Sequence, residues 1–85
     1  MILKVFTKED GPGTEEALDL AKEMEENDFQ VEYYDFDQPE TYKLAEIFEI
    51  FSVPSFVVTQ ADGREVSAWR GEIPSIDEIK NFMSQ

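Results

Sequence analysis

The segment at residues 2–7, with the sequence ILKVFT, constrains the fold of this chain more than any other feature. Its β-branched and aromatic residues predict a strand, and apolar residues fall on both faces instead of alternating with polar ones. Strands of this kind are the buried inner strands of sheets that carry helices on both faces. We therefore expect a sheet with residues 2–7 at an inner position and with helices against both of its faces.

The rest of the chain divides into segments with helical and strand-like patterns. Apolar residues recur at three- and four-residue spacing in the predicted helices, whereas Val, Tyr and Phe cluster in the predicted strands. Pro12 suits the first position of the first helix, because its fixed φ is helical and its missing N–H would be unpaired there. The predicted order is β-α-β-α-β-β-α, with strands at residues 2–7, 29–36, 52–59 and 66–70 and helices at residues 12–26, 37–51 and 74–85.

The same patterns predict turns, a helix cap and the core-facing side chains. Asp62 and Gly63 predict a tight turn between the last two strands. Ser75 and Glu78 match the S-x-x-E capping box that opens a helix. The residues expected to face the core are Ala17, Leu18, Ala21 and Met24 in the first helix, Tyr42, Leu44, Ala45, Ile47, Phe48 and Phe51 in the second, and Ile76, Ile79, Phe82 and Met83 in the third, with Trp69 on the last strand.

Length, charge and two missing residue types limit the function. A chain of 85 residues makes a single domain, residues 1–85. Its net charge of −13 disfavours nucleic acid and anionic membranes as partners. No apolar run is long enough to span a bilayer or direct export, so we expect a cytoplasmic protein. We also expect a monomer. The absence of cysteine and histidine removes disulfides, thiolate chemistry and the commonest general base, and no metal site is expected.

Four stretches in order resemble one known superfamily. They are ILKVFTK at residues 2–8, YYDFDQPE at residues 33–40, SVPSFVV at residues 52–58 and AWRGEIPSIDEIKNFM at residues 68–83. Together with the Pro-containing loop before the first helix, they resemble the thioredoxin-like superfamily, in its glutaredoxin and small thioredoxin branch. The resemblance implies a mixed four-stranded sheet with helices on both faces and a cis peptide bond before Pro54.

The loop before the first helix departs from that superfamily at its reactive positions. Members of the superfamily open this helix with a Cys-x-x-Cys tetrad, whereas the tetrad here reads Gly11, Pro12, Gly13 and Thr14. Thiol-disulfide exchange needs an attacking thiolate, and the threonine hydroxyl supplies none. We therefore expect no oxidoreductase activity and no enzyme.

Without the cysteines, the resemblance still implies a binding groove. The expected ligand is an extended peptide or a protein partner that pairs with main-chain groups near Pro54. A glutathione-like tripeptide is an alternative ligand, although Glu72 stands where a second glycine is usual and would repel an anion. No other cofactor is expected. The predicted ligand-binding residues are Lys8, Gly11, Pro12, Gly13, Thr14, Val53, Pro54, Ser55, Gly71, Glu72 and Ser75.

A second hypothesis assigns the chain to regulatory or scaffold domains. Here the groove is a remnant, and a partner docks on the acidic face of the first helix, which is otherwise a solvated surface. Residues 11–14 would then only shape the start of that helix. Two carboxylate pairs, Asp35 with Asp37 and Glu46 with Glu49, lack the differing environments of an acid and a base in one pocket. The acidic face comprises Glu15, Glu16, Asp19, Glu23, Glu25, Glu26 and Asp28.

Overall fold

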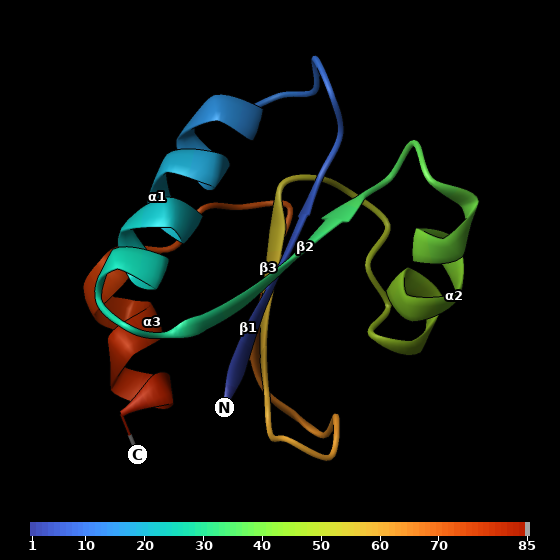
Figure 1. The fold of residues 1–85 in the computed structure, drawn as a ribbon. Coiled ribbons are helices and arrows are strands. Elements are labelled where there is room, and N and C mark those ends of the chain that lie inside the picture. The colour runs from blue at the N-terminus through green and yellow to red at the C-terminus, as the bar shows by residue number, and fades with distance from the viewer. Residues whose placement is uncertain (85) are drawn as a thin grey trace.

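The computed structural model describes residues 1–84 and has the predicted order of elements (Figure 1). Residue 85, which the predicted third helix included, lies outside the described residues. The elements are β1 (Ile2–Thr7), α1 (Thr14–Glu26), β2 (Gln30–Asp35), α2 (Pro39–Ile47), β3 (Ser55–Thr59), β4 (Glu65–Arg70) and α3 (Ile76–Met83).

The four strands form one mixed sheet in the order β2-β1-β3-β4. β1 runs parallel to β2 and antiparallel to β3, and β3 and β4 form an antiparallel hairpin. Val5, for example, is the register partner of Tyr33 on one side and of Phe56 on the other. The predicted inner position of β1 is therefore confirmed, as is the mixed four-stranded sheet.

Helices cover both faces of this sheet, as predicted. Figure 1 shows α1 and α3 on one side and α2 on the other. Leu3 and Val5 point to the first face, while Phe6 points to the second. The buried core under α1 and α3 comprises Leu3, Val5, Ala17, Ala21, Met24, Phe56, Val58, Trp69, Ile79 and Met83, and the core under α2 comprises Phe6, Ala45, Phe48, Ile50 and Val57.

α1 begins at Thr14, so the prediction that Pro12 opens it is wrong. Gly13 has φ 67° and ψ 9°, a left-handed conformation that interrupts the helix at its N-cap. Pro12 lies in the turn before it. The first intrahelical bond runs from the Ala17 amide to the Gly13 carbonyl at 2.9 Å. A glycine in the left-handed region, rather than the proline, sets the start of this helix.

α2 ends at Ile47, four residues before its predicted end. The Ile50 amide donates to the Ala45 carbonyl at 2.8 Å and the Glu49 amide to the Glu46 carbonyl at 3.1 Å, which is the Schellman pattern. Glu49 occupies the left-handed position of this turn, with φ 56°. Glycine is the usual residue at this position, so the sequence carries no recognisable stop signal there.

The predicted apolar stripe of α2 is wrong for three of its residues. Tyr42 is 56 %, Ile47 is 72 % and Phe51 is 81 % exposed, although Ala45 and Phe48 are buried as predicted. A nine-residue helix that reverses at its end brings only one side against the sheet. The prediction that Leu18 of α1 faces the core is also wrong, since this side chain is 39 % exposed.

α3 follows its predicted pattern closely. The Ser75 hydroxyl accepts a hydrogen bond from the Glu78 amide at 3.2 Å, and the Glu78 carboxylate accepts one from the Ser75 amide at 3.3 Å. This reciprocal pair is the predicted capping box. Ile79 and Met83 are buried against the sheet. No helix in the part of the chain that the structure describes is both long and apolar enough to cross a membrane.

Candidate functional site

The loop between β1 and α1 is closed by one backbone oxygen. The Lys8 carbonyl accepts hydrogen bonds from the Gly11 amide at 2.8 Å and from the Thr14 hydroxyl at 2.6 Å. Asp10 takes a left-handed conformation, with φ 60°, inside this turn. The Thr14 hydroxyl also lies 3.2 Å from the Gly11 carbonyl. This hydroxyl is therefore held by the backbone of its own loop, which does not favour a role as a nucleophile.

Gly11 is tightly enclosed by the same turn. A β-carbon at this position would lie 2.9 Å from the Lys8 carbonyl oxygen and 3.2 Å from the Lys8 β-carbon. Real β-carbons do not approach backbone atoms so closely, so a cysteine at Gly11 would require the loop to move. The loop is shaped around glycine at the position where the resemblance places the first cysteine.

Gly13 brings the loop against two other segments. A β-carbon at Gly13 would lie 3.3 Å from the Pro54 γ-carbon and 3.2 Å from the Ile73 δ-carbon. The Val53–Pro54 peptide bond is cis. We call this meeting point of three segments the Pro54 site, and define it as Gly13, Val53, Pro54, Gly71 and Ile73. Sequence reasoning missed Ile73, because an isolated isoleucine in a turn looks like an ordinary packing residue.

Two further contacts hold the Pro54 site together. The buried Ser55 hydroxyl donates to the Ser52 carbonyl at 2.8 Å and accepts from the Gly71 amide at 2.9 Å. Gly71 has φ 72°, and a β-carbon on it would lie 2.7 Å from the Ser52 hydroxyl oxygen. Ser55 thus ties Ser52 to Gly71 beside Pro54, and its buried hydroxyl has already used its one donor within the protein.

The remaining predicted site residues lie at the edge of this arrangement. Lys8, Pro12, Glu72 and Ser75 are exposed, and Pro54 is buried. The Ser75 hydroxyl is engaged in the cap of α3. No carboxylate within residues 1–84 lies within ion-pair distance of the Lys8 ammonium.

The electrostatics around the loop are acidic. A hollow of about 490 Å³ opens beside the start of α1 and is lined in part by Gly11, Gly13 and Thr14. Its other lining residues are the carboxylates Glu15, Glu16 and Asp19. Negative side chains in the first turn already compensate the positive end of the helix dipole. This hollow therefore suits a cationic group better than an anion.

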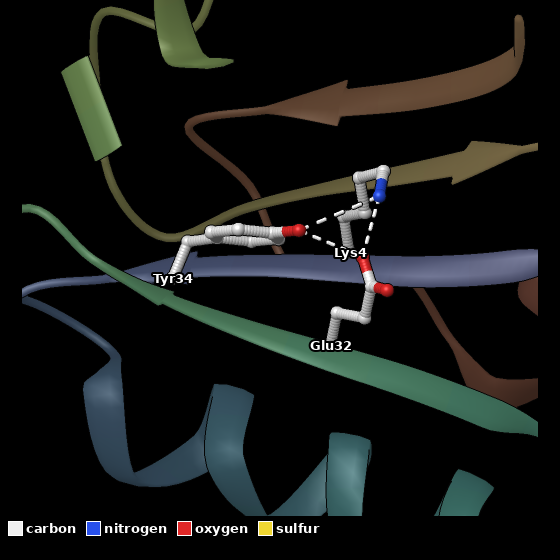
Figure 2. Close-up of polar contacts among 3 residues, drawn as sticks. All are labelled: Lys4, Glu32 and Tyr34. Atoms are coloured by element: carbon white, nitrogen blue, oxygen red, sulfur yellow. Dashed lines mark hydrogen bonds and ion pairs between the residues drawn. The ribbon is translucent and has the colours of Figure 1, made fainter. Parts of the chain in front are cut away.

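A cluster that sequence reasoning missed lies on the α2 face of the sheet (Figure 2). The Lys4 ammonium, on β1, contacts a carboxylate oxygen of Glu32, on β2, at 2.5 Å. The Tyr34 hydroxyl donates to the same oxygen at 2.7 Å, and the Lys4 ammonium lies 3.5 Å from that hydroxyl. Lys4 and Glu32 are register partners in the parallel pair, a relation that only the folded sheet reveals.

The three groups of this cluster stabilise one another in their ordinary charge states. Burial alone would lower the pKa of Lys4, but the hydrogen bond to Glu32 and the charges of its neighbours raise that pKa above 10.5. The hydrogen bonds from Lys4 and then from Tyr34 lower the pKa of Glu32 below 4.5. Burial, followed by the hydrogen bond to Glu32, raises the pKa of Tyr34. No free base remains, so the cluster holds the sheet together and is not suited to acid-base chemistry.

Comparison with solved structures decides the fold. Thioredoxin 1 from the thermophilic eubacterium Thermosipho africanus TCF52B superimposes with a TM-score of 0.74 at 18 % identity, over 99 % of this chain and 91 % of that one. The thioredoxin-like protein BC3987 gives a TM-score of 0.57 at 18 % identity, over 94 % of this chain and 97 % of that one. A point mutant of BC3987 gives 0.59 at 17 % identity, over 95 % and 97 %.

The chain has a thioredoxin-like fold. No protein-family model and no curated protein matches the sequence. At 17 and 18 % identity, the structural likeness establishes the fold and not an activity. This thioredoxin-like chain contains no cysteine, so its loop cannot carry out the thiol chemistry that the resemblance would otherwise imply.

Proposed function

We propose that this chain is a non-catalytic binding module whose Pro54 site holds an extended, basic segment of a partner protein. The observation that carries the proposal is the convergence of three segments, far apart in the sequence, on Gly13, Pro54 and Ile73. Gly13 is exposed, and its missing side chain lets the start of α1 lie directly against Pro54 and Ile73, so one ligand could contact all three segments.

The chemistry of the site supports binding rather than catalysis. The chain has no cysteine or histidine, and the hydroxyls of Thr14, Ser55 and Ser75 are engaged in hydrogen bonds within the protein. None of these three hydroxyls is therefore an activated nucleophile. An extended peptide would bind here through main-chain hydrogen bonds to the segment that precedes β3, with neighbouring side chains giving selectivity.

Charge favours a basic peptide over glutathione. Glu15, Glu16 and Asp19 line the adjacent hollow, and Glu72 lies next to Gly71. Among the predicted ligand-binding residues, Lys8 is the cation that could meet a carboxylate. The net charge of −13 adds a long-range attraction for cations. Glutathione, which carries a net negative charge, is expected to bind more weakly than a basic peptide.

An amide NMR titration tests the proposal. The probe is a capped hexapeptide of alternating valine and lysine, with reduced glutathione as the second ligand. We expect saturable shifts at residues 11–14, 53 and 71–73 with the hexapeptide, and smaller shifts with glutathione. Unchanged spectra up to millimolar hexapeptide would contradict the proposal.

A matched pair of charge reversals separates the Pro54 site from the acidic face of α1. The double variant Glu15→Lys with Glu72→Lys alters the site, whereas Glu23→Lys with Glu26→Lys makes the same charge change near the far end of α1. We expect the first pair to weaken hexapeptide binding roughly tenfold and the second less than about threefold, since charges beyond a Debye length are screened. Equal weakening by both pairs would favour docking on the helix face instead.

A further inference from the structure

A second hollow lies on the α2 side of the molecule and is independent of the Pro54 site. Its volume is about 550 Å³, and it shares no residue with the Pro54 site. Three aromatic side chains and a single carboxylate are among its lining residues. The lining residues are Phe36, Tyr42, Ala45, Glu46, Ile50 and Phe51.

The turn after α2 explains why large apolar side chains surround this hollow. The Schellman turn folds the chain back so that Ile50 is buried under α2, and the next residue, Phe51, is left 81 % exposed. Tyr42, on α2, is 56 % exposed. Phe36 is half-buried and packs edge-on against Phe6, with ring centroids 6.1 Å apart. Apolar surface gathered around a concavity, unlike single exposed apolar residues, is typical of interaction sites.

The walls of the hollow are held in place without a ligand. The Arg70 guanidinium, on β4, donates two hydrogen bonds to the Phe48 carbonyl at 2.9 and 3.1 Å, at the end of α2. Arg70 also pairs with Glu65 at 2.9 Å. These contacts tie the turn after α2 to the sheet, so the backbone that carries Ile50 and Phe51 needs little ordering on binding.

The net negative charge of the segment that forms the hollow favours a basic partner. Residues 35–51 contain five carboxylates and one ammonium, Lys43. A second copy of this chain would bring a further charge of −13 against this surface, which opposes self-association. A basic segment with apolar side chains on one face would satisfy the aromatic lining and Glu46, and would be attracted by the net negative charge of residues 35–51.

We propose that this hollow docks a basic amphipathic helical segment of another protein, with a large apolar side chain of that segment placed among Phe36, Tyr42 and Phe51. This interaction does not depend on the Pro54 site, because the two surfaces share no residue. A partner could therefore engage either surface alone.

The test uses a synthetic basic amphipathic helix, a peptide of two LKKLLKL repeats, titrated into the whole isotopically labelled chain. We expect saturable shifts centred on Phe36, Tyr42 and Phe51. Phe51→Ser should weaken binding roughly tenfold, as truncation of a buried aromatic anchor does. Ile47→Ser is the matched control, because Ile47 is 72 % exposed on α2 but does not line the hollow, and it should change affinity less than about twofold.

Three results would overturn the proposal. Equal binding by a peptide of two SKKSSKS repeats would show that charge alone attracts the probe. Shifts centred on α1 would place the probe on the acidic helix face and refute the docking proposal. Shifts centred on the Pro54 site would also refute the docking proposal, but would support the proposed function. Sedimentation equilibrium that shows a dimer lost in Phe51→Ser would identify a second copy as the occupant. Both variants alter exposed side chains, and dispersed amide spectra will verify that each is folded.

Discussion

The two faces of the sheet are completed in different ways. The face under α1 and α3 is a continuous apolar core, with Leu3, Phe56 and Ile79 fully buried. The other face has a single nine-residue helix, α2, over a smaller core that includes Phe6 and Val57. Figure 1 shows α2 against only part of this face. Where α2 does not extend, polar and exposed aromatic residues replace the apolar core.

Incomplete coverage accounts for the unusual features of the α2 face. Lys4 is 8 % exposed in the middle of an inner strand, and its partners Glu32 and Tyr34 lie on the edge strand β2 (Figure 2). A second helix on this face would have required apolar residues at these positions. The aromatic hollow beside α2 lies on the same side of the molecule. We therefore expect the first face to supply most of the stability, and the proposed docking hollow lies on the second.

The largest expected effect contrasts a core phenylalanine with an exposed one. Phe56→Ala should destabilise the fold by about 3–5 kcal/mol, because it removes a fully buried aromatic side chain between the sheet and α1 and α3. Phe51→Ala should change the free energy of unfolding by less than about 0.5 kcal/mol, since its side chain is already in water. Urea denaturation measures both. A similar cost for the two variants would refute the contrast between the faces.

The second prediction concerns the polar cluster of the α2 face. Glu32→Gln should cost about 1–2 kcal/mol, because it leaves the Lys4 ammonium buried without a counter-charge, while partial exposure of Glu32 reduces the penalty. Lys4→Met should cost less, since an apolar side chain of similar length fills the same space and Glu32 keeps its contact with water. Urea denaturation at neutral pH compares the variants. A larger cost for Lys4→Met than for Glu32→Gln would contradict this account of the cluster.

The same cluster predicts a pH dependence. The lowered pKa of Glu32 means that its contribution to stability is present above pH 4.5 and is lost as the pH falls through the folded-state value. The raised pKa of Lys4 means that its contribution is present below pH 10.5 and is lost as the pH rises through the folded-state value. The unfolding free energy of the wild type minus that of Lys4→Met should therefore be constant between these limits and fall below pH 4.5.

Comparison with Lys4→Met is the appropriate control for this titration, because protonation of the other carboxylates relieves the repulsion of a chain with charge −13 in both proteins. Thermal unfolding followed by circular dichroism at a series of pH values measures the difference. A difference that stays flat below pH 4.5 would show that the pair does not perturb the pKa of Glu32.

The smallest predicted effect concerns the turns that end α1 and α2. Both are Schellman turns with an acidic residue in the left-handed position, Asp28 at φ 66° after α1 and Glu49 at φ 56° after α2. A β-carbon is disfavoured in this conformation, so Glu49→Gly should stabilise the fold by about 0.5–1 kcal/mol. Asp28→Gly should stabilise it less, because aspartate tolerates this conformation better than glutamate. Destabilisation by Glu49→Gly in urea would refute the interpretation of this turn.

Local patterns were sufficient to predict much of the fold. The apolar residues of β1 predicted its inner position, and Ser75 with Glu78 predicted the start of α3. These signals involve residues that are adjacent or a few positions apart. The mixed sheet followed from the resemblance of four stretches in order, and the comparison with solved structures confirmed a thioredoxin-like fold.

The features that were missed depend on non-local contacts or on unusual backbone conformations. The start of α1 was predicted two residues too early, because the sequence does not show that Gly13 takes a left-handed φ. Glu49 ended α2 in a position where glycine is the usual signal. The pairing of Lys4 with Glu32 required the strand register, and the position of Ile73 against Gly13 required the tertiary fold.

The central claim is that a cysteine-free thioredoxin-like chain binds an extended basic peptide at its Pro54 site. The most direct test is paramagnetic relaxation with the valine-lysine hexapeptide carrying a nitroxide on an added cysteine, since the protein has no cysteine that could take up the label. We predict selective loss of amide signals at Gly13, Val53, Gly71 and Ile73. Signal loss spread along the acidic face of α1, or confined to the α2 hollow, would contradict the claim.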